Sequence, residues 1–201
     1  TYQFEDLDNW PAIKHAAKQP GNYVSGGAAN HYSLYEQDFD LARNLHMNAF
    51  RFSVEWSRIQ PEEGAWNAEA VRHYKEYIAA LKKRGLEPVM TLFHFTLPIW
   101  FARKGGFERR ANVRDFVEFV DRLLEELGPS VRYIITINEP EIYVHHSYIS
   151  GEWPPQQTRK LLGLRVYRNL AVTHNRVARV IHQKSRKYKV SVAKNNTFVY
   201  P

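Results

Sequence analysis

The chain has 201 residues, 44% of them hydrophobic, with 12 Tyr, 11 Phe and 5 Trp, which is enough apolar surface for a single sizeable core. It contains no cysteine, which excludes a disulfide framework, a thiolate zinc site and a cysteine nucleophile. There is no apolar run of about 18 residues and no leader pattern at the amino terminus, so we expect neither a membrane span nor a signal peptide, and a cytoplasmic protein.

The net charge of +7 is unevenly distributed, because no Asp or Glu follows Glu152. The basic residues of this last part are Arg159, Lys160, Arg165, Arg168, Arg176, Arg179, Lys184, Arg186, Lys187, Lys189 and Lys194. They could form a nucleic-acid-binding face or a solvated helix surface whose acidic counterpart lies on another polypeptide. Their spread along a helix, without interleaved stacking aromatics, favours the solvated surface, so we expect no nucleic acid partner.

Strands and helices alternate along most of the chain. Short apolar, β-branched runs predict strands over 49–54, 88–93, 131–137 and 190–193, with a further short strand at 2–4. Helical spacing of apolar residues predicts helices over 33–46, 67–84, 112–127 and 161–185. N-cap patterns occur at Ser33 with Glu36, at Asn67, and at Asn112 with Asp115. The apolar face of the last helix is predicted to consist of Leu164, Tyr167, Ala171, His174, Ala178 and Ile181.

This alternation requires parallel strand pairing through right-handed crossovers, in either an open doubly wound sheet or a (β/α)₈ barrel. An open nucleotide-binding sheet would be supported by a glycine-rich phosphate motif after an early strand, and none occurs. We therefore predict an α/β fold of the (β/α)₈ TIM barrel type. Because such a barrel usually needs about 250 residues, residues 1–201 are expected to be the amino-terminal part of a single barrel, covering about its first five βα units.

The strand predicted over 131–137 carries a carboxylate at its carboxyl end. Pro140 ends the strand because it has no N–H to donate, and Glu139 lies where α/β folds present functional groups to a ligand. A structural role for Glu139, as a capping or salt-bridged carboxylate, is the alternative.

Polar and aromatic residues follow several predicted strands and are expected to share one rim. They are found in the stretches 51–56, 93–95, 138–139 and 195–196. Aromatic rings with hydrogen-bonding side chains and a carboxylic acid suit a neutral polyhydroxylated substrate. A metal site built from His94, His145 and His146 is the weaker alternative, because adjacent histidines point in different directions and no HExxH spacing occurs. We expect no metal and no cofactor.

The sequence resembles glycoside hydrolase family 1, the β-glucosidase and β-galactosidase family of retaining enzymes. The matching stretches are Tyr2-Gln3-Phe4-Glu5, His31-Tyr32, 48–59 (NAFRFSVEWSRI), 91–98 (TLFHFTLP) and Thr136-Ile137-Asn138-Glu139-Pro140. Tyr200-Pro201 resembles the exit of the family's fifth strand. Phe95 is a departure, since many members have Trp there, and this bears on the sugar preference.

The resemblance implies a role for each matching site residue. Glu139 would be the general acid/base, and Asn138 would hold the sugar 2-hydroxyl. Gln3 and His94 would bind hydroxyls of the same ring, and Arg51 would lie beneath the catalytic carboxylates and orient the nucleophile. The expected substrate is a β-linked oligosaccharide or an aryl or alkyl β-glycoside.

A retaining mechanism needs a second carboxylate, which the family carries on its seventh strand. Glu55 and Glu141 are alternatives within this sequence, although Glu55 is equally explained as a partner of Arg58. We therefore expect the nucleophile in a carboxyl-terminal half outside these 201 residues, and the chain alone to be inactive. It would pair with a complementary barrel segment or self-associate. The competing hypothesis is a catalytically incomplete half-barrel that binds saccharide or a partner chain.

Overall fold

The computed structural model describes residues 28–196. The expected strand at 2–4, including Gln3, and the dipeptide Tyr200-Pro201 lie outside this range. Four parallel strands form one sheet: β1 (Ala49–Ser53), β2 (Glu87–Phe93), β3 (Tyr133–Asn138) and β4 (Lys189–Ala193). All four central strand predictions are confirmed to within two residues at each end.

One helix precedes the first strand, and helices connect each strand to the next. They are α1 (His31–Asn44), α2 (Trp56–Ile59), α3 (Ala68–Lys83), α4 (Ile99–Arg103), α5 (Val113–Glu126), α6 (Pro140–Val144) and α7 (Lys160–Lys184). Short helical turns lie at Gly106–Glu108, Arg110–Asn112 and Gly128–Ser130, and a π-helical turn at His145–Ile149 follows α6. The sequence predicted the four long helices; the short α2, α4 and α6 fall in segments that carry no helical periodicity long enough to detect.

The strand order decides between the two α/β architectures. Neighbours in the sheet follow the chain order β1-β2-β3-β4, and every pair is parallel. A doubly wound sheet reverses its order at a switch point, whereas a barrel adds each strand beside the last. The described sheet therefore has the strand arrangement of the first part of a (β/α)₈ barrel.

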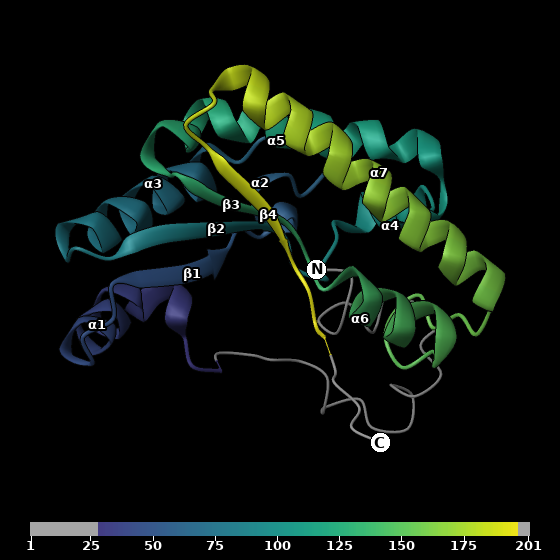
Figure 1. Ribbon diagram of the computed structural model, residues 1–201, viewed down its shortest axis with the longest axis horizontal. Helices are drawn as coiled ribbons and strands as arrows, with labels where there is room; N and C mark the ends of the chain where they lie inside the picture. Colours follow the sequence, from purple (N-terminus) through teal and green to yellow (C-terminus); the bar gives the residue numbers. More distant parts are fainter. Residues whose placement is uncertain (1–27, 197–201) are drawn as a thin grey trace.

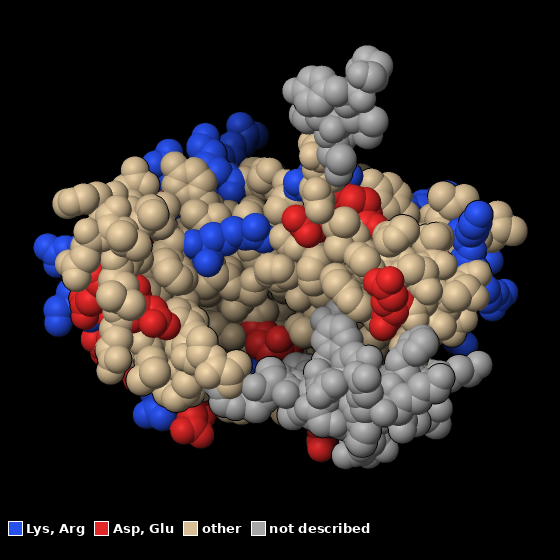
Figure 2. Space-filling view, turned by 90° about the horizontal axis from the view of Figure 1, so that it is seen from below, with Lys and Arg blue, Asp and Glu red and all other residues tan. Residues whose placement is uncertain are grey.

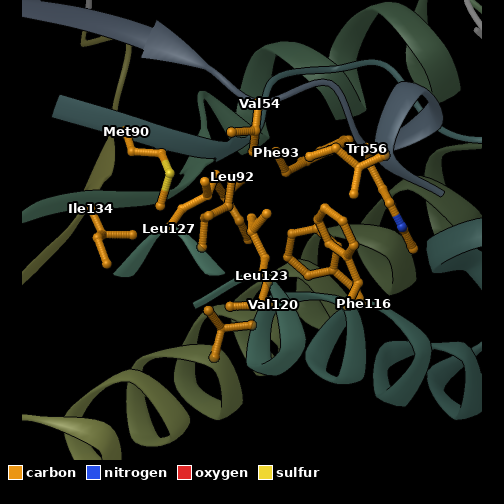
Figure 3. Packing of buried hydrophobic residues seen from close by; sticks show 14 of the residues in the cluster. Val54, Trp56, Met90, Leu92, Phe93, Phe116, Val120, Leu123, Leu127 and Ile134 are labelled. Carbon is orange, nitrogen blue, oxygen red and sulfur yellow. The ribbon is translucent and has the colours of Figure 1, made fainter. Parts of the chain in front are cut away.

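One face of the sheet is covered by helices. Figure 1 shows α5 and α7 lying side by side over the strands. Alternate strand residues point to this side and are buried: Phe52, Met90, Leu92 and Ile134. Figure 3 shows Trp56 and Phe93 packed with Phe116 of α5, and the ring centroids of Trp56 and Phe116 are 5.1 Å apart. The hydrophobic core thus lies between the sheet and its helices.

The opposite face of the sheet, which would be the interior of a barrel, is open among the described residues. Arg51, Ser191 and Lys189 are exposed there, and Tyr133 retains 37% of its accessible surface. An apolar, β-branched run such as 131–137 is typical of a strand covered on both faces, and the amino-terminal half of β3 does not meet that expectation. Figure 2, seen from below, shows a hollow near the centre of the molecule with acidic surface at its bottom.

Of the three predicted N-caps, the structure confirms the capping hydrogen bond of one. Asn67 is confirmed, since its side chain accepts a hydrogen bond from the Ala70 N–H at 3.0 Å. Ser33 lies inside α1, which begins two residues earlier after Asn30 in a left-handed conformation, so the predicted capping box is wrong. Asn112 is at the N-cap position of α5, but its side chain makes no capping hydrogen bond. Its amide nitrogen donates to the carbonyls of Lys104 and Gly106, which ties the loop before α5 to the start of the helix.

The predicted apolar face of the last helix is wrong in its first half, where Leu164, Tyr167 and Ala171 are exposed, whereas His174 and Ala178 are half-buried and Ile181 is buried. The residues of α7 that are buried are Gly163, Val166, Asn169, Leu170, Thr173, Val177 and Ile181, and of these only Ile181 was predicted. Leu164 keeps 66% of its surface and Leu161 keeps 83%. The helix has two apolar stripes: one is buried, and the first half of the other is exposed. No helix among residues 28–196 is long and apolar enough to cross a membrane.

Part of the acidic counterpart of the basic segment lies in this chain. Lys184 forms ion pairs with Asp121 at 2.8 Å and Glu125 at 3.3 Å, both on α5. Lys194 pairs with Glu141 at 2.9 Å. The expectation that the counterpart lies on another polypeptide is therefore wrong for these two lysines.

Candidate active site

The carboxyl ends of the four parallel strands lie at one edge of the sheet, and four of the predicted site residues come from this edge. Arg51 belongs to β1, His94 follows β2 directly, Asn138 ends β3, and Glu139 follows it. The fifth, Gln3, lies outside the described residues. The sheet therefore brings together side chains that are up to 88 positions apart in the sequence.

Arg51 connects three strands across the open face. Its Nε donates a hydrogen bond of 3.0 Å to Thr91 Oγ1 on β2, and a terminal guanidinium nitrogen donates to Asn138 Oδ1 on β3. A planar guanidinium can hold two such acceptors in fixed directions. Asn138 is buried, so this contact fixes its amide orientation and leaves the amide nitrogen to donate to a ligand.

His94 is held at the rim by Ser53. Its Nδ1 lies 2.7 Å from Ser53 Oγ, so Nε2 is the atom that can meet a ligand hydroxyl. Burial and the positive charge of Arg51 lower the pKa of His94 below its usual value. The negative charge of Glu139 acts in the opposite direction, which places that carboxylate within electrostatic range of the imidazole. A neutral imidazole results, able to donate or accept.

Glu139 sits in an unusual backbone conformation between β3 and α6. Its φ of 39° and ψ of 63° are left-handed, a region that costs a residue with a side chain roughly 1–3 kcal/mol. The conformation is held on both sides: the Glu139 N–H donates to the Ala193 carbonyl at 2.8 Å, and its carbonyl accepts from Ile142 and Tyr143. Pro140 then occupies the first position of α6, where no N–H is needed.

Phe95, one residue after His94, is the second rim residue in a left-handed conformation, with φ of 73°. Its ring lies 5.0 Å from that of Trp153, which in turn stacks on His146 at 4.5 Å. We call Phe95, Trp153 and His146 the aromatic wall. Strain at both Phe95 and Glu139 points to a site that the fold holds in place.

Two aromatic residues expected at the rim are in the core instead. Trp56 is 2% exposed and packs on Trp100, Phe101 and α5, and Phe93 is 1% exposed. Their proximity in sequence to the rim was misleading, because the turn after β1 rotates Trp56 toward the helices.

The two other carboxylates near the strand ends have structural contacts. Glu55 accepts hydrogen bonds from the Ser57 N–H, the Ser57 hydroxyl and the Thr96 hydroxyl, so it caps α2. Arg58, its expected partner, lies instead over the ring of Tyr32. Glu141 accepts from the Asn195 N–H at 2.6 Å and pairs with Lys194.

His145 and His146 do not converge with His94 on one point. His146 Nδ1 lies 2.5 Å from Glu152, and the His145 side chain is exposed. Among residues 28–196, no group of three His, Cys, Asp or Glu side chains could hold a metal ion.

Three residues of the site escaped the sequence reasoning. Ser53 and Thr91 occur in stretches singled out above, and their inward position follows from strand alternation with Arg51 once the register is known. Trp153 lies in a loop between Gly151 and Pro154, and only its composition, a lone Trp among turn residues, could have drawn attention to it.

Known proteins resemble this chain over nearly its whole length. The β-glucosidase A of Thermotoga maritima is 29% identical over 197 residues, which is 96% of this chain and 44% of that protein. Beta-glucosidase 25 of Oryza sativa subsp. japonica is 36% identical over 168 residues, covering 77% of this chain and 33% of that protein. The chain thus spans less than half the length of these relatives.

Solved structures give the same picture. A beta-glycosidase from Pyrococcus horikoshii matches 96% of this chain and 45% of its own, with a TM-score of 0.82 and 36% identity. The β-glucosidase of Thermotoga maritima in complex with castanospermine matches 100% of this chain and 48% of its own, with a TM-score of 0.88 and 29% identity. The model of glycosyl hydrolase family 1 matches residues 6–201, and the chain belongs to that family.

Proposed function

We propose that this chain provides the acid/base half of a retaining β-glycosidase that removes terminal β-D-glucosyl or galactosyl residues. The observation that carries the proposal is the convergence of Arg51, His94, Asn138 and Glu139 at the carboxyl ends of three neighbouring strands. Family membership supports the reaction class, and the open sheet face supports a barrel completed by further residues.

In the proposed mechanism Glu139 donates a proton to the glycosidic oxygen as the leaving group departs. It then takes a proton from the water that attacks the glycosyl-enzyme intermediate. A fixed backbone at Glu139 serves both steps, because the carboxyl group must reach the same point twice. The second carboxylate attacks the anomeric carbon, about 5–5.5 Å from the first.

The neighbouring residues bind and orient the sugar. Arg51 fixes the Asn138 oxygen, so the Asn138 amide nitrogen is directed to the sugar 2-hydroxyl. His94, neutral and anchored by Ser53, presents Nε2 to another hydroxyl. The aromatic wall offers apolar ring surface to the C–H faces of the sugar or to a flat leaving group.

The nucleophile is proposed to come from outside these 201 residues, from a segment that completes the barrel. Glu55 and Glu141 are already engaged in contacts that hold α2 and the end of β4. The 201-residue chain alone is therefore proposed not to turn over a glycoside.

The test uses the barrel assembled from this chain and the segment that completes it. Glu139→Gln should lower kcat/KM for phenyl β-glucoside by about 10²–10⁴-fold, the usual contribution of a general acid. A dinitrophenyl β-glucoside, whose leaving group needs little protonation, should still form the glycosyl-enzyme, and added azide should restore its breakdown. Glu141→Gln is the control and should leave both rates within a few-fold. An unchanged phenyl glucoside rate in Glu139→Gln would show that Glu139 is not the acid.

A second candidate function is favoured by the open sheet face: a half-barrel that binds saccharide or a partner chain without hydrolysis. The two candidate functions differ in whether a second polypeptide that completes the barrel is present together with this chain. An intact-mass measurement that finds the chain only as a 23.6 kDa species with no companion polypeptide would favour the half-barrel over the divided enzyme.

A further inference from the structure

A pocket of about 290 Å³ lies on the flank of the molecule, beside α5 and away from Arg51, His94, Asn138 and Glu139, none of which line it. Its walls come from the loop after β1, from α4 and from α5. The lining residues that matter here are Gln60, Glu63, Trp66, Trp100, Glu118 and Arg122. The loop after β1 and the segment that holds α4 both begin at the carboxyl ends of strands. The pocket therefore lies toward the same edge of the sheet as the candidate active site, but among the helices.

The two indole rings of the pocket are held in place by polar contacts. Trp100 Nε1 donates to the Gln60 carbonyl at 3.0 Å, and the Gln60 side chain accepts from Trp56 Nε1 at 2.8 Å. The guanidinium of Arg122 lies 4.2 Å from the ring centre of Trp66. Both rings are only half-buried, so they keep surface for a ligand without having to move.

The charged groups of the pocket are mixed in sign. Lys104 lies 2.5 Å from Glu63 and 2.8 Å from Asp115, which neutralises much of their charge. Glu118 is exposed on α5 one turn before Arg122, so an acceptor and a donor stand side by side at the opening.

This combination selects a class of ligand. A phosphate would meet three carboxylates, and a purely apolar molecule would leave the carboxylates and the guanidinium without compensation for lost water. A sugar ring has an apolar C–H face for an indole, together with hydroxyls that donate to carboxylates and accept from Arg122. We propose that this pocket is a second carbohydrate site, which binds one glycosyl unit of a neutral oligosaccharide apart from the catalytic centre.

The experiment titrates the 201-residue chain, which is proposed not to hydrolyse glycosides on its own, with cellotetraose and follows the indole N–H signals by NMR. The signals of Trp66 and Trp100 should shift on saturation. Trp66→Ala should weaken the binding that these signals report at least tenfold, and Trp66→Phe should restore part of it. Glu118→Lys, at an exposed position that does not threaten folding, should weaken it as well.

Trp153→Ala is the matched control, because it removes an indole from the aromatic wall and leaves the pocket intact. It should not change the titration curve of Trp66. If the Trp66 and Trp100 signals stay unmoved at millimolar cellotetraose, or if Glu118→Lys and Trp66→Ala bind as the parent does, the second site is disproved. None of these outcomes depends on whether Glu139 is the acid/base.

Discussion

The two faces of the sheet carry very different side chains although they belong to the same strands. On the helix side, Met90 and Ile134 are at most 1% exposed, whereas on the other side Arg51, Tyr133 and Ser191 meet solvent. The chain therefore completes one face with its own helices and leaves polar and aromatic groups on the other. The difference shows that the stability of these residues comes from the helix side, while the chemistry proposed above depends on what closes the open side.

The strongest test of this comparison removes one large side chain from each face. Phe116 of α5 is fully buried against Trp56, Phe93 and Phe107, so Phe116→Ala should lower the free energy of unfolding by about 3–5 kcal/mol. Tyr133→Ala on the open face, where the side chain keeps 37% of its surface, should cost clearly less, about 1 kcal/mol. Urea denaturation followed by circular dichroism measures both. Equal losses would mean that the open face is packed in solution.

A smaller effect is expected from Glu108, a carboxylate on the covered side of the sheet whose pKa is raised by burial. Glu108 is half-buried beneath α7; burial raises its pKa above the ordinary value of 4.5, against the hydrogen bond from Tyr148 and the charges of Arg159, Arg109 and Arg165. A raised folded pKa means that the contribution of this group to stability is present below pH 4.5 and is lost as pH rises through the folded value. Glu108→Gln should therefore gain stability over the parent as pH rises from 4.5, and then level off.

This pH dependence is measured as the difference between the unfolding free energies of Glu108→Gln and the parent across pH 4 to 8. Glu87→Gln, which removes a carboxylate from an exposed strand position, is the matched control. A difference for Glu108→Gln that falls with pH would show that the nearby arginines outweigh burial.

Much of the fold and of the candidate site could be predicted from the sequence because it depends on strand periodicity and parallel pairing. Once four strands are parallel, the residues at their carboxyl ends share an edge, so Arg51, His94, Asn138 and Glu139 meet without further information. The features that the sequence did not predict depend on the backbone conformation of single residues. The left-handed conformation of Asn30 starts α1 early, and the turn after β1 directs Trp56 into the core between the sheet and its helices.

The buried face of α7 could not be predicted for a different reason. Its sequence carries two apolar stripes, and periodicity alone does not say which stripe meets the rest of the chain. The structure buries Val166, Leu170 and Val177 in the contacts of α7 with α5 and the other helical segments, and leaves Leu161 and Leu164 exposed. Both stripes are genuine packing surfaces, but one of them needs a further element to cover it.

That second stripe leads to the prediction with the smallest effect on folding and a clear effect on assembly. Among residues 28–196, the edge of β4 is unpaired and one sheet face is open, and with the exposed Leu161 and Leu164 these features should make the isolated chain dimerise, pair with a complementary segment or aggregate. Leu164→Lys should change the unfolding free energy by less than about 0.5 kcal/mol, because the side chain is 66% exposed. It should nevertheless shift the mass measured by light scattering toward that of a monomer.

Gln183→Lys, exposed elsewhere on α7, adds the same charge away from the stripe and should leave the association unchanged. If the parent chain is a monodisperse monomer that unfolds cooperatively, the open face and the second stripe are already satisfied within the chain, and the barrel needs no further segment to be stable.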